Sequence, residues 1–468
     1  MLGGIFVISK NEISLDDAQL LTFASTIIID THKGDLEHAI NDMEEEYLLG
    51  ISKVDDKQFE TKVSEENYGQ EDILKNKENF KYCNEYGAFS ADGKEYLINT
   101  NKNNRIPTVW SHILANEKFG TVITESMGGY TWYKNSRLNR LTSWHNKAFL
   151  DIPSEVIYIQ DETTGKTWSL GVNPMPDEND YNVVYGFGYA KYMHTSDEIM
   201  QELEVFVPNE DAAKIGILSL KNKSLSRKKL RIVYYLKPVL DEDEIKSNGY
   251  INLNFNKNGN LIEIQNLYEN EFKSLMFVSS SEKIKSYTGD KKFFLGNGGL
   301  SNPDGLKKYR LNNSNAIGRK PCVAIEIEVE IDAASDKEIV LSFGADENIV
   351  DLKNMAYKYS RVTNCKQELE AVKKKWKDLL ERMQVYTPIE SINIMLNGWT
   401  LYQTMSSRLL GRSGFYQSGG AYGFRDQLQD SLAFKYISPE IVKNQIIKHS
   451  KHQFVEGDVE HWWHEETR

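Results

Sequence analysis

The segment CVAIEIEVEID, residues 322–332, alternates apolar and acidic side chains with a period of two. Successive side chains of a β-strand point to opposite faces, so this pattern places the isoleucines and one valine on one face and the glutamates on the other. Such alternation is typical of antiparallel sheets that bury a single face. The segment therefore predicts an antiparallel strand with one buried face.

Similar runs fill the surrounding sequence from residue 82 to residue 345, separated by Gly, Asn, Asp and Pro. Further candidate strands are residues 199–207, 214–220, 230–236, 261–266, 274–279 and 338–343. So many strands without helices between them predict a large two-layer sandwich rather than a parallel sheet. A basic run in this region is interpreted as the solvated side of a strand; it consists of Arg227, Lys228, Lys229 and Arg231.

Helical patterns follow the strands. Apolar residues recur at three- and four-residue spacing over residues 366–383, which predicts an amphipathic connecting helix. A second helix is predicted over residues 387–410, with Thr387 as its cap and Glu390 as the capping-box partner. A third is predicted over residues 438–453, which begin with the Ser-Pro pair that often opens a helix.

The sequence before the strands has a different character. Residues 1–50 predict a short strand and two helices, the first opened by a capping-box-like pair of Ser14 and Asp17. Residues 51–81 are rich in charged and amide side chains, which indicates a solvated linker. The predicted organisation is an N-terminal part and linker over residues 1–81, the sandwich over 82–345, a helical linker over 346–387 and a helical domain over 388–468.

Charge and cysteine content restrict the partners and the compartment. The net charge of −12 argues against a nucleic acid or an anionic membrane surface, because both are bound by clustered positive charge. The spacing of Cys83, Cys322 and Cys365 fits neither a metal site nor a disulfide framework, which favours a reducing, cytoplasmic compartment. No apolar run approaches the ~18 residues of a membrane helix, so we expect no membrane contact by this chain.

The most chemically informative stretch is residues 411–457, which combines glycines, aromatic residues, arginines and carboxylates. The arginines Arg408, Arg412 and Arg425 offer planar donor groups, and Asp426 and Asp430 offer acceptors for sugar hydroxyls. These are the predicted ligand-binding residues. The alternative is structural: Asp426 caps a helix and Arg425 pairs with Asp430.

Two further clusters were weighed as sites. Trp462 and Trp463, within HWWHEE, are candidates for the lining of a sugar cleft or for ordinary core packing. The His-x-x-His spacing around them lacks a third ligand, so no metal site is predicted. Residues 128–146 interleave aromatic residues with arginines and are interpreted as a polar loop at a domain contact. The sequence has no P-loop, nucleotide fingerprint or GxSxG elbow, which lowers the NTPase, dehydrogenase and serine-hydrolase interpretations.

Several motifs together resemble glycoside phosphorylase family 94, in particular the cyclic β-1,2-glucan synthases and 1,2-β-oligoglucan phosphorylases. The motifs are LGGIFVI (2–8), YGAFS (86–90), GGYTW (128–132), NSRLNRLT (135–142), WTLYQT (399–404), RSGFYQSGGAYGFRDQLQD (412–430) and QFVEGDVEHWWH (453–464). The resemblance covers nearly the whole chain and implies a β-supersandwich, a helical linker and an (α/α)6 barrel. Family members acting on β-1,4 or β-1,3 linkages share this fold, so the linkage stays open.

The resemblance also implies an activity: cleavage of a β-glucosidic bond by inorganic phosphate with inversion, giving α-glucose 1-phosphate, with phosphate as co-substrate and no cofactor. Asp426 and the arginines near it would hold the glucose at the non-reducing end of a β-glucan oligosaccharide, with Trp462 and Trp463 near the cleft. In similar proteins the catalytic aspartate lies in a Ser-Asp-Asp motif just downstream of the HWWH segment. No catalytic residue is therefore predicted within this chain, and that aspartate is expected beyond Arg468.

From this we expect a fragment holding only the first helices of an incomplete barrel and inactive alone. Its apolar positions Ile392, Leu396 and Trp399 would be partly uncovered. A missing C-terminal half or a homodimer partner would complete it, and intact synthases of this kind are anchored in the inner membrane through segments absent here. The alternatives are a non-catalytic carbohydrate-binding or assembly module and a split enzyme completed by another polypeptide.

Overall fold

The computed structural model describes residues 80–146, 151–268, 272–315 and 320–466, together with Ser14 and Asp17. The strand, helices and linker predicted for residues 1–79 otherwise lie outside the described residues. Ser14 and Asp17 form the predicted capping contact, in which the Asp17 amide donates to Ser14 Oγ at 3.1 Å and the Ser14 hydroxyl donates to Asp17 Oδ2 at 2.6 Å.

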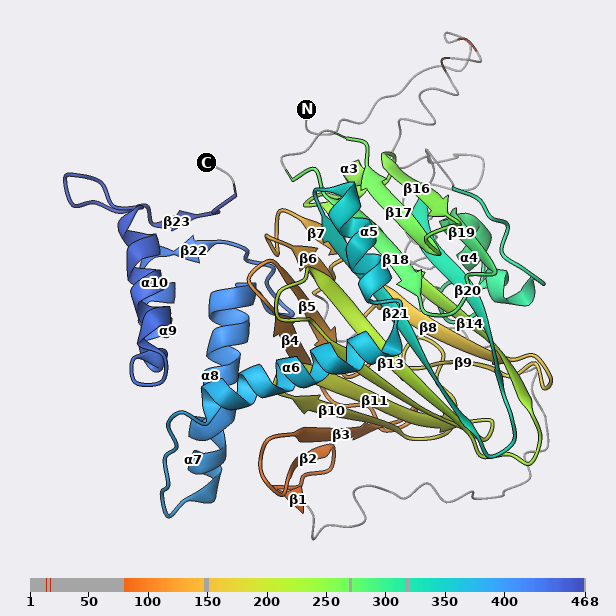
Figure 1. Cartoon of the computed structure of the whole chain (residues 1–468), viewed down its shortest axis with the longest axis horizontal. Coiled ribbons are helices and arrows are strands. Elements are labelled where there is room, and N and C mark those ends of the chain that lie inside the picture. Colours follow the sequence, from red (N-terminus) through yellow and green to blue (C-terminus); the bar gives the residue numbers. More distant parts are fainter. Residues whose placement is uncertain are drawn as a thin grey trace, which may run out of the picture. The chain divides into compact units, whose positions relative to one another are not determined.

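An 11-stranded sheet forms the larger layer of the fold (Figure 1). Neighbouring strands in it run antiparallel. Its order is β1 (Phe80–Lys81), β2 (Gly87–Ser90), β3 (Tyr96–Thr100), β10 (Tyr181–Gly186), β11 (Tyr189–Ser196), β12 (Ile199–Phe206), β13 (Ala213–Asn222), β21 (Asp336–Asp346), β18 (Leu275–Ser280), β17 (Leu261–Asn266) and β16 (Ile251–Asn256).

Two five-stranded antiparallel sheets accompany it. The first has the order β19 (Ser286–Asp290), β20 (Pro321–Ile331), β14 (Lys228–Leu236), β8 (Glu155–Asp161) and β9 (Thr167–Ser169). The second has the order β15 (Pro238–Asp241), β7 (Arg140–Thr142), β6 (Gly129–Tyr133), β5 (Phe119–Thr124) and β4 (Ser111–Ala115). The predicted large antiparallel sandwich is thus confirmed, and the alternating segment of residues 322–332 forms most of strand β20.

One apolar core lies between the sheets. Ile325, Ile327 and Val329 of β20 belong to the same buried cluster as Leu203 of β12 and Leu218 of β13. The alternation in β20 therefore produces the buried face that it predicts. Burial of alternate large aliphatic side chains on facing sheets is the dominant stabilising contribution in such a sandwich.

The basic run of β14 is less exposed to solvent than predicted. Arg231 is buried, and Glu326 is fully buried on the face opposite the isoleucines. Lys228 is buried on the other face, which it shares with the core residues Leu230 and Ile232. Arg231 Nη2 donates to Glu326 Oε2 at 2.6 Å, and Lys228 Nζ lies 2.8 Å from Asp161 Oδ2. Buried charges need such partners, since leaving one unpaired in a low-dielectric interior is costly.

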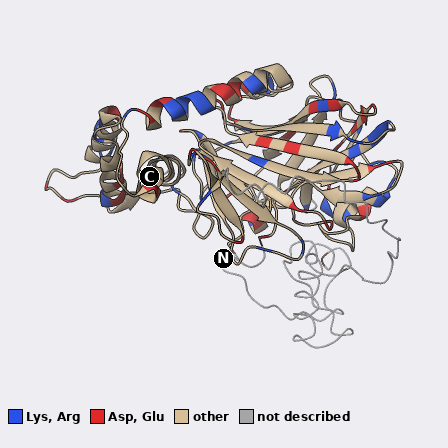
Figure 2. Ribbon diagram, turned by 90° about the horizontal axis from the view of Figure 1, so that it is seen from below, with Lys and Arg blue, Asp and Glu red and all other residues tan. Residues whose placement is uncertain are grey.

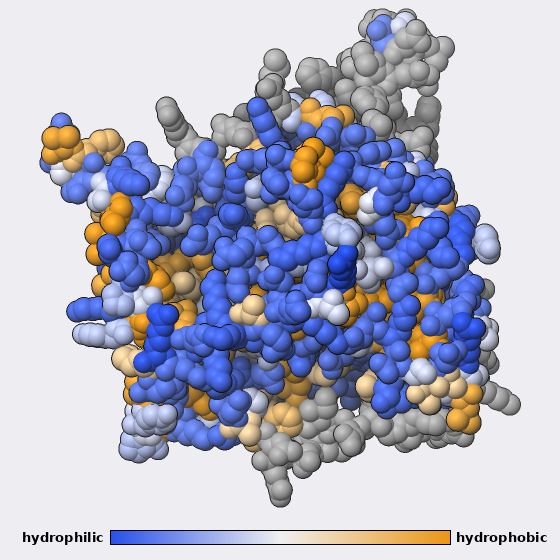
Figure 3. All heavy atoms as spheres, viewed as in Figure 1, coloured by the Kyte–Doolittle hydropathy of each residue, from blue (hydrophilic) through white to orange (hydrophobic). Residues whose placement is uncertain are grey.

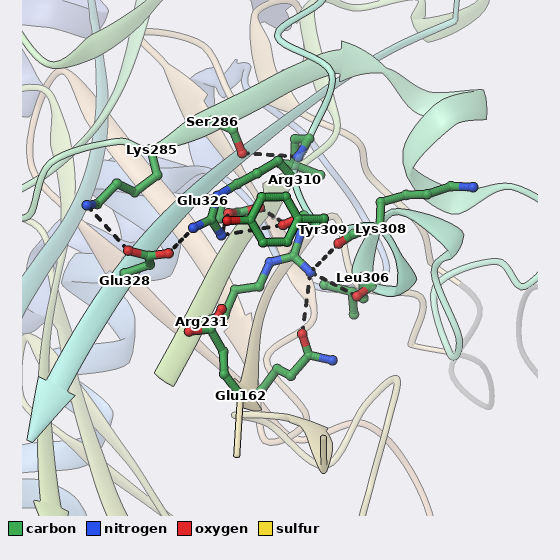
Figure 4. A network of polar contacts seen from close by, with 12 residues as sticks. Glu162, Arg231, Lys285, Ser286, Leu306, Lys308, Tyr309, Arg310, Glu326 and Glu328 are labelled. Carbon is green, nitrogen blue, oxygen red and sulfur yellow. Dashed lines mark hydrogen bonds and ion pairs between the residues drawn. The ribbon is translucent and has the colours of Figure 1, made fainter. Parts of the chain in front are cut away.

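A loop between β19 and β20 covers this charged face. Arg310 Nη1 also donates to Glu326 at 2.6 Å, and Arg231 Nη1 donates to the carbonyls of Leu306 and Lys308 at 2.9 Å. Figure 4 shows both arginines converging on Glu326, and Lys285 reaching Glu328 from the other side. The interpretation of the basic run as solvated holds for Arg227 and Lys229, whose side chains are 62% and 44% exposed, and was wrong for Lys228 and Arg231. The sequence pattern does not show which segment folds over Arg231.

The helices that follow the strands pack on the outer face of the large sheet. They are α5 (Ile349–Lys358) and α6 (Val362–Leu380). Leu369, Val372 and Trp376 of α6 share a buried cluster with Ile215 and Ile217 of β13. The predicted connecting helix is confirmed, although it begins and ends a few residues earlier than the pattern suggested. In Figure 2 the basic residues of the helices and strands are interspersed with acidic ones.

A continuous helical segment then runs from Glu390 to Gly411. It consists of α7 (Glu390–Ile394), the π-helical η4 (Met395–Trp399), α8 (Thr400–Gln403) and the π-helical η5 (Thr404–Gly411). The predicted capping box is only half formed, because the Thr387 hydroxyl accepts from the Ile389 amide at 3.2 Å but Glu390 does not bind the Thr387 amide. Thr387 instead pairs with Asn393, whose side chain accepts from the Thr387 amide at 2.8 Å and donates to its carbonyl at 3.0 Å.

The remaining helices are α9 (Phe424–Ser431), the 3-10 turn η6 (Leu432–Phe434) and α10 (Pro439–Ser450), which matches the third predicted helix. Short helical turns within the sandwich are α3 (Glu244–Ser247), α4 (Lys291–Leu295) and η3 (Asp304–Lys307). The C-terminal helices carry apolar surface, visible as orange patches at the left of Figure 3. Ile392 and Leu396 are exposed, as predicted, whereas Trp399 is buried.

Candidate functional site

The site region begins where the long helix ends, at Arg412. This residue adopts a left-handed conformation with φ of 47°, which turns the chain out of the helix. Its guanidinium is buried and donates to the Gly420 carbonyl at 3.0 Å and to the Tyr422 hydroxyl at 2.9 Å. The Gly420 amide donates back to the Arg412 carbonyl at 2.9 Å. Arg412 therefore closes the loop of residues 412–422, and its donors are already in use.

The sandwich supports this loop through residues 128–146. Asn135 Nδ2 lies 3.2 Å from the Gly420 carbonyl and 2.8 Å from Glu466 Oε2, and Trp144 Nε1 donates to the Phe415 carbonyl at 3.1 Å. A Cβ on Gly420 would lie 2.1 Å from Asn135 Oδ1, so only glycine fits there. The predicted contact between residues 128–146 and another part of the chain is confirmed, but the segment is only partly the predicted loop, because residues 129–133 and 140–142 form strands β6 and β7.

A two-stranded ribbon joins the beginning and the end of the region. Strand β22 (Tyr422–Gly423) pairs antiparallel with β23 (Trp462–Trp463). Figure 1 shows this ribbon beside α9 and α10. The pairing brings the two sequence motifs, RSGFYQSGGAYGFRDQLQD and QFVEGDVEHWWH, to the same place.

The two adjacent tryptophans have different environments, because neighbouring residues of a strand point to opposite faces. Trp463 is buried, and its ring stacks on His452 with centroids 4.0 Å apart and on Tyr422 with centroids 5.6 Å apart. Trp462 is half exposed, with the Arg137 guanidinium 6.0 Å from its ring centroid. Trp463 is thus part of the packing of this region, whereas part of the Trp462 ring remains accessible to solvent.

Asp426 and Arg425 lie in the first turn of α9 and are both exposed. Neither side chain has a hydrogen-bond or ion-pair partner among the described residues. A Cβ on Gly423 would lie 2.7 Å from Asp426 Oδ2, and Gly423 is the pairing partner of Trp462. The Asp426 carboxylate and the backbone of Trp462 therefore meet at one glycine, and Arg425 precedes Asp426 in the same turn of α9. The amide of Gly423 is satisfied by Gln427 Oε1 at 2.7 Å, so Asp426 is not needed as a helix cap.

The other predicted site residues pair with each other. Arg408 Nε donates to Asp430 Oδ2 at 2.6 Å, which links η5 to α9. The structural alternative, a pair between Arg425 and Asp430 with Asp426 as cap, is wrong in both parts, since Asp430 faces η5. Arg408 and Asp430 stabilise the junction of the two helices in the present arrangement, and Arg425 is left with its donors unused by the described residues.

Sequence reasoning missed a polar cluster under the ribbon. Lys448 Nζ lies 2.9 Å from the Tyr422 hydroxyl and 3.0 Å from Glu465 Oε2. Burial opposes the charge on Lys448, but Tyr422 and Glu465 outweigh it, so the pKa of Lys448 is raised. Burial lowers the pKa of His449 and of His464 nearby. Tyr422 and Glu465 stood inside the quoted motifs, whereas Lys448 lies on α10, whose sequence gives no signal of a site.

Comparison with protein families places this geometry in context. Residues 94–362 match the family model described as Glycosyl hydrolase 94, supersandwich domain. The chain belongs to glycosyl hydrolase family 94. Residues 375–467 match a second model, Glycosyl hydrolase 94 superfamily, catalytic domain, so the Arg412 loop, α9 and the ribbon all lie in the part of the chain that is similar to the family's catalytic domain.

Individual relatives in the family are glycoside phosphorylases and synthases. The chain is 30% identical over 386 residues to the cyclic beta-(1,2)-glucan synthase NdvB of Rhizobium meliloti (strain 1021), an alignment that covers 82% of this chain and 14% of NdvB. It is 25% identical to N,N'-diacetylchitobiose phosphorylase of Vibrio proteolyticus, covering 77% of this chain and 46% of the relative. The chain thus spans less than half the length of these relatives.

Among solved structures, the chain is similar to a bacterial glucoamylase complexed with acarbose. The TM-score is 0.48 at 13% identity, over 79% of this chain and 55% of that chain.

Proposed function

We propose that this chain contributes the sugar-holding part of a family 94 enzyme that acts on β-1,2-glucan oligosaccharides, with inorganic phosphate as co-substrate and α-glucose 1-phosphate as product. The sugar class is supported by family membership, and the β-1,2 linkage by the similarity to the synthase of Rhizobium meliloti. The linkage is the finer part of the proposal, since other relatives are named for other disaccharides.

The observation that carries the proposal is the group formed by Asp426, Arg425 and Trp462. An exposed carboxylate accepts hydrogen bonds from vicinal hydroxyls, an exposed guanidinium donates to ring or glycosidic oxygens, and an indole face packs on the apolar face of a pyranose ring. These are the groups that fix the orientation of a neutral sugar. Asp426 and Arg425 lie in α9 and Trp462 in β23, and both elements adjoin the loop of residues 412–422, which Arg412 and Asn135 fix through the Gly420 carbonyl.

Phosphorolysis with inversion needs little more from the protein than one acid. Phosphate takes the place of the water and general base of an inverting hydrolase, so the protein protonates only the leaving oxygen. Asp426 is exposed at the start of α9, where its carboxylate is open to a ligand. The 468 residues contain no Ser-Asp-Asp tripeptide. We therefore assign Asp426 to binding and expect the acid from a polypeptide segment outside these residues.

Two consequences belong to the same proposal. The polypeptide by itself binds sugar without turnover, and a further segment or a second chain completes the site. The compartment is cytoplasmic, supported by Cys83, Cys322 and Cys365, all of which are free thiols. None of the helices in the described part of the chain has both the length and the hydrophobicity needed to cross a bilayer.

A non-catalytic carbohydrate-binding module is the second candidate. It is favoured by the same observation that assigns Asp426 to binding, because an exposed, unpaired carboxylate beside an exposed tryptophan suits recognition without proton transfer. The two candidates differ in whether added phosphate and a completing polypeptide produce glucose 1-phosphate.

Titration calorimetry with β-1,2-glucotriose tests the shared part of both candidates. Asp426→Asn is expected to weaken the binding at the Asp426 site at least tenfold, because a hydrogen bond to a charged group contributes about 1.5–3 kcal/mol. Asp458→Asn is the matched control, since Asp458 is exposed in the turn before the ribbon. Equal affinities of the two variants for the sugar would show that Asp426 is not part of the binding site. Release of glucose 1-phosphate by the purified chain in the presence of phosphate would refute the assignment of the catalytic acid to another segment.

A further inference from the structure

A pocket lies between the sandwich and the start of the long helix, away from the Asp426 group. Its volume is about 370 Å³, within the ~300–1,000 Å³ typical of small-molecule sites. Strands β2, β3, β4 and β10 form one wall, and Met395, Trp399 and Gln403 of the helix form the other. Along the helix axis Trp399 and Gly411 are roughly 18 Å apart at 1.5 Å per residue, so the pocket and the Arg412 loop are separate.

Aromatic side chains dominate the lining. Phe89, Tyr96, Trp110 and Trp399 all contribute, and Phe89, Tyr96 and Trp110 are only partly buried. Their rings meet edge to face, with centroids 4.8 Å apart for Phe89 and Tyr96 and 5.8 Å apart for Tyr96 and Trp110. An edge-to-face pair covers one face of only one of its two rings, so the remaining faces can pack on another molecule.

The helix wall is fixed in place. Trp399 Nε1 donates to the Gly93 carbonyl at 2.8 Å, and Cβ atoms on Gly93 and Gly398 would lie 2.8 Å from Ile394 and 2.5 Å from Phe187, respectively. Glycine at both positions permits this close approach of helix and strands. The pocket is therefore a formed feature of the fold rather than a gap between loosely packed elements.

The polar groups of the lining carry no charge at neutral pH. Burial lowers the pKa of His112 to about 4, and its Nε2 lies 2.8 Å from the Gly186 carbonyl. The lining has no Asp, Glu, Lys or Arg. Ser111 and Gln403 are exposed at the pocket, and their side chains have no hydrogen-bond partner among the described residues. A hydroxyl and an amide beside aromatic faces suit a neutral polyhydroxyl ligand and disfavour an anion such as phosphate.

We propose that this pocket is a second, non-catalytic saccharide site, which binds one or two glucosyl units of a β-glucan by packing on Trp110 and hydrogen bonding to Ser111 and Gln403. The choice of a β-glucan rests on the proposed function. The assignment of the pocket as a saccharide site rests on the residues that line it. A glucan chain that occupies both this pocket and the Asp426 site would be held at two points, which raises its effective affinity.

The test uses the whole chain and β-1,2-glucotriose in titration calorimetry, with the Asp426→Asn variant as the background. Residual binding in that variant is expected, and it should weaken about tenfold on adding Trp110→Leu, because one aromatic stacking partner is lost. Gln403→Ala provides a second variant that leaves the core unchanged, because Gln403 is exposed; it should also weaken the residual binding. Thermal unfolding of each variant controls for loss of fold.

The outcomes separate the two proposals. The pocket site is refuted if the Asp426→Asn variant still binds sugar and this binding does not change on adding Trp110→Leu or Gln403→Ala. It is also refuted if the Asp426→Asn variant shows no binding at millimolar sugar. Binding that is insensitive to Asp426→Asn but lost with Trp110→Leu supports the pocket and refutes the Asp426 site. Tight binding of an apolar peptide with no response to sugar would also refute the saccharide assignment.

Discussion

Replacing Glu326 by glutamine tests whether the covered charges of β14 and β20 depend on each other. Glu326 is fully buried and accepts from both Arg231 and Arg310. Arg310 also pairs with Glu328, so it keeps a carboxylate when Glu326 is lost. Arg231 keeps only the carbonyls of the covering loop and the weak bond to Gln160. The substitution therefore leaves one buried guanidinium without a counter-charge.

The expected loss of unfolding free energy is about 3 kcal/mol, the lower end of the 3–5 kcal/mol for breaking a buried pair, because the glutamine oxygen still accepts a hydrogen bond. At roughly 2 °C per kcal/mol for a domain of this size, the Tm falls by about 6 °C. Differential scanning fluorimetry and the urea midpoint measure the change. Glu330→Gln is the matched control on the same strand, since Glu330 pairs with Arg227 at the surface and such pairs contribute less than about 1 kcal/mol.

A loss in Glu326→Gln no larger than that in Glu330→Gln would refute the reasoning. The double variant Arg231→Met with Glu326→Leu supplies a second check, because removing both charges of a buried pair is often close to neutral. It should be more stable than Glu326→Gln alone.

Two further predictions concern other buried groups. Arg412→Lys should increase amide hydrogen exchange over residues 412–422, because a lysine ammonium cannot replace a guanidinium that binds both Gly420 and Tyr422. Arg408→Lys should leave this exchange unchanged, because Arg408 belongs to an exposed ion pair. Glu125 has a raised pKa, first from burial and then from the charge of Asp151, so the folded state retains a proton that the unfolded chain releases above about pH 4.3. The free energy of unfolding should therefore fall as the pH rises above about 4.3. The Glu125→Gln variant should have a higher Tm than the parent protein at pH 8 but not at pH 4, and parallel curves of Tm against pH for the two proteins would contradict this.

The strands and most helices could be predicted from the sequence because their signals are local. The alternation in residues 322–332 and the three- and four-residue spacing in residues 366–383 are properties of single segments, and both elements formed as predicted. Partners that come from distant segments could not be predicted. The burial of Arg231 depends on a loop some 75 residues further along the chain, as its bond to the Leu306 carbonyl shows.

The candidate site shows the same division. The motifs around Asp426 and Trp462 were recognised from residue types, and the structure brings them together through the β22–β23 ribbon. The sequence could not predict which arginines are free to bind a ligand, because this depends on the groups that surround each side chain in the folded protein. Arg412 points into the protein and Arg408 meets Asp430, whereas Arg425 points to solvent. A side chain's role was set by the tertiary environment rather than by its motif.

The two π-helical stretches in the segment Glu390–Gly411 have a consequence for the evolution of this protein. A π turn holds more residues than an α turn, so it acts as an insertion that the helix has absorbed without breaking. Each residue advances an α-helix by about 100°, so every position after such an insertion is rotated with respect to the uninterrupted pattern. Trp399 ends the first stretch and Gly411 ends the second, so both the pocket wall and the turn into Arg412 are oriented by this rotation. Homologous sequences that lack an insertion should show one-residue gaps here, together with different residues at the positions that these two face.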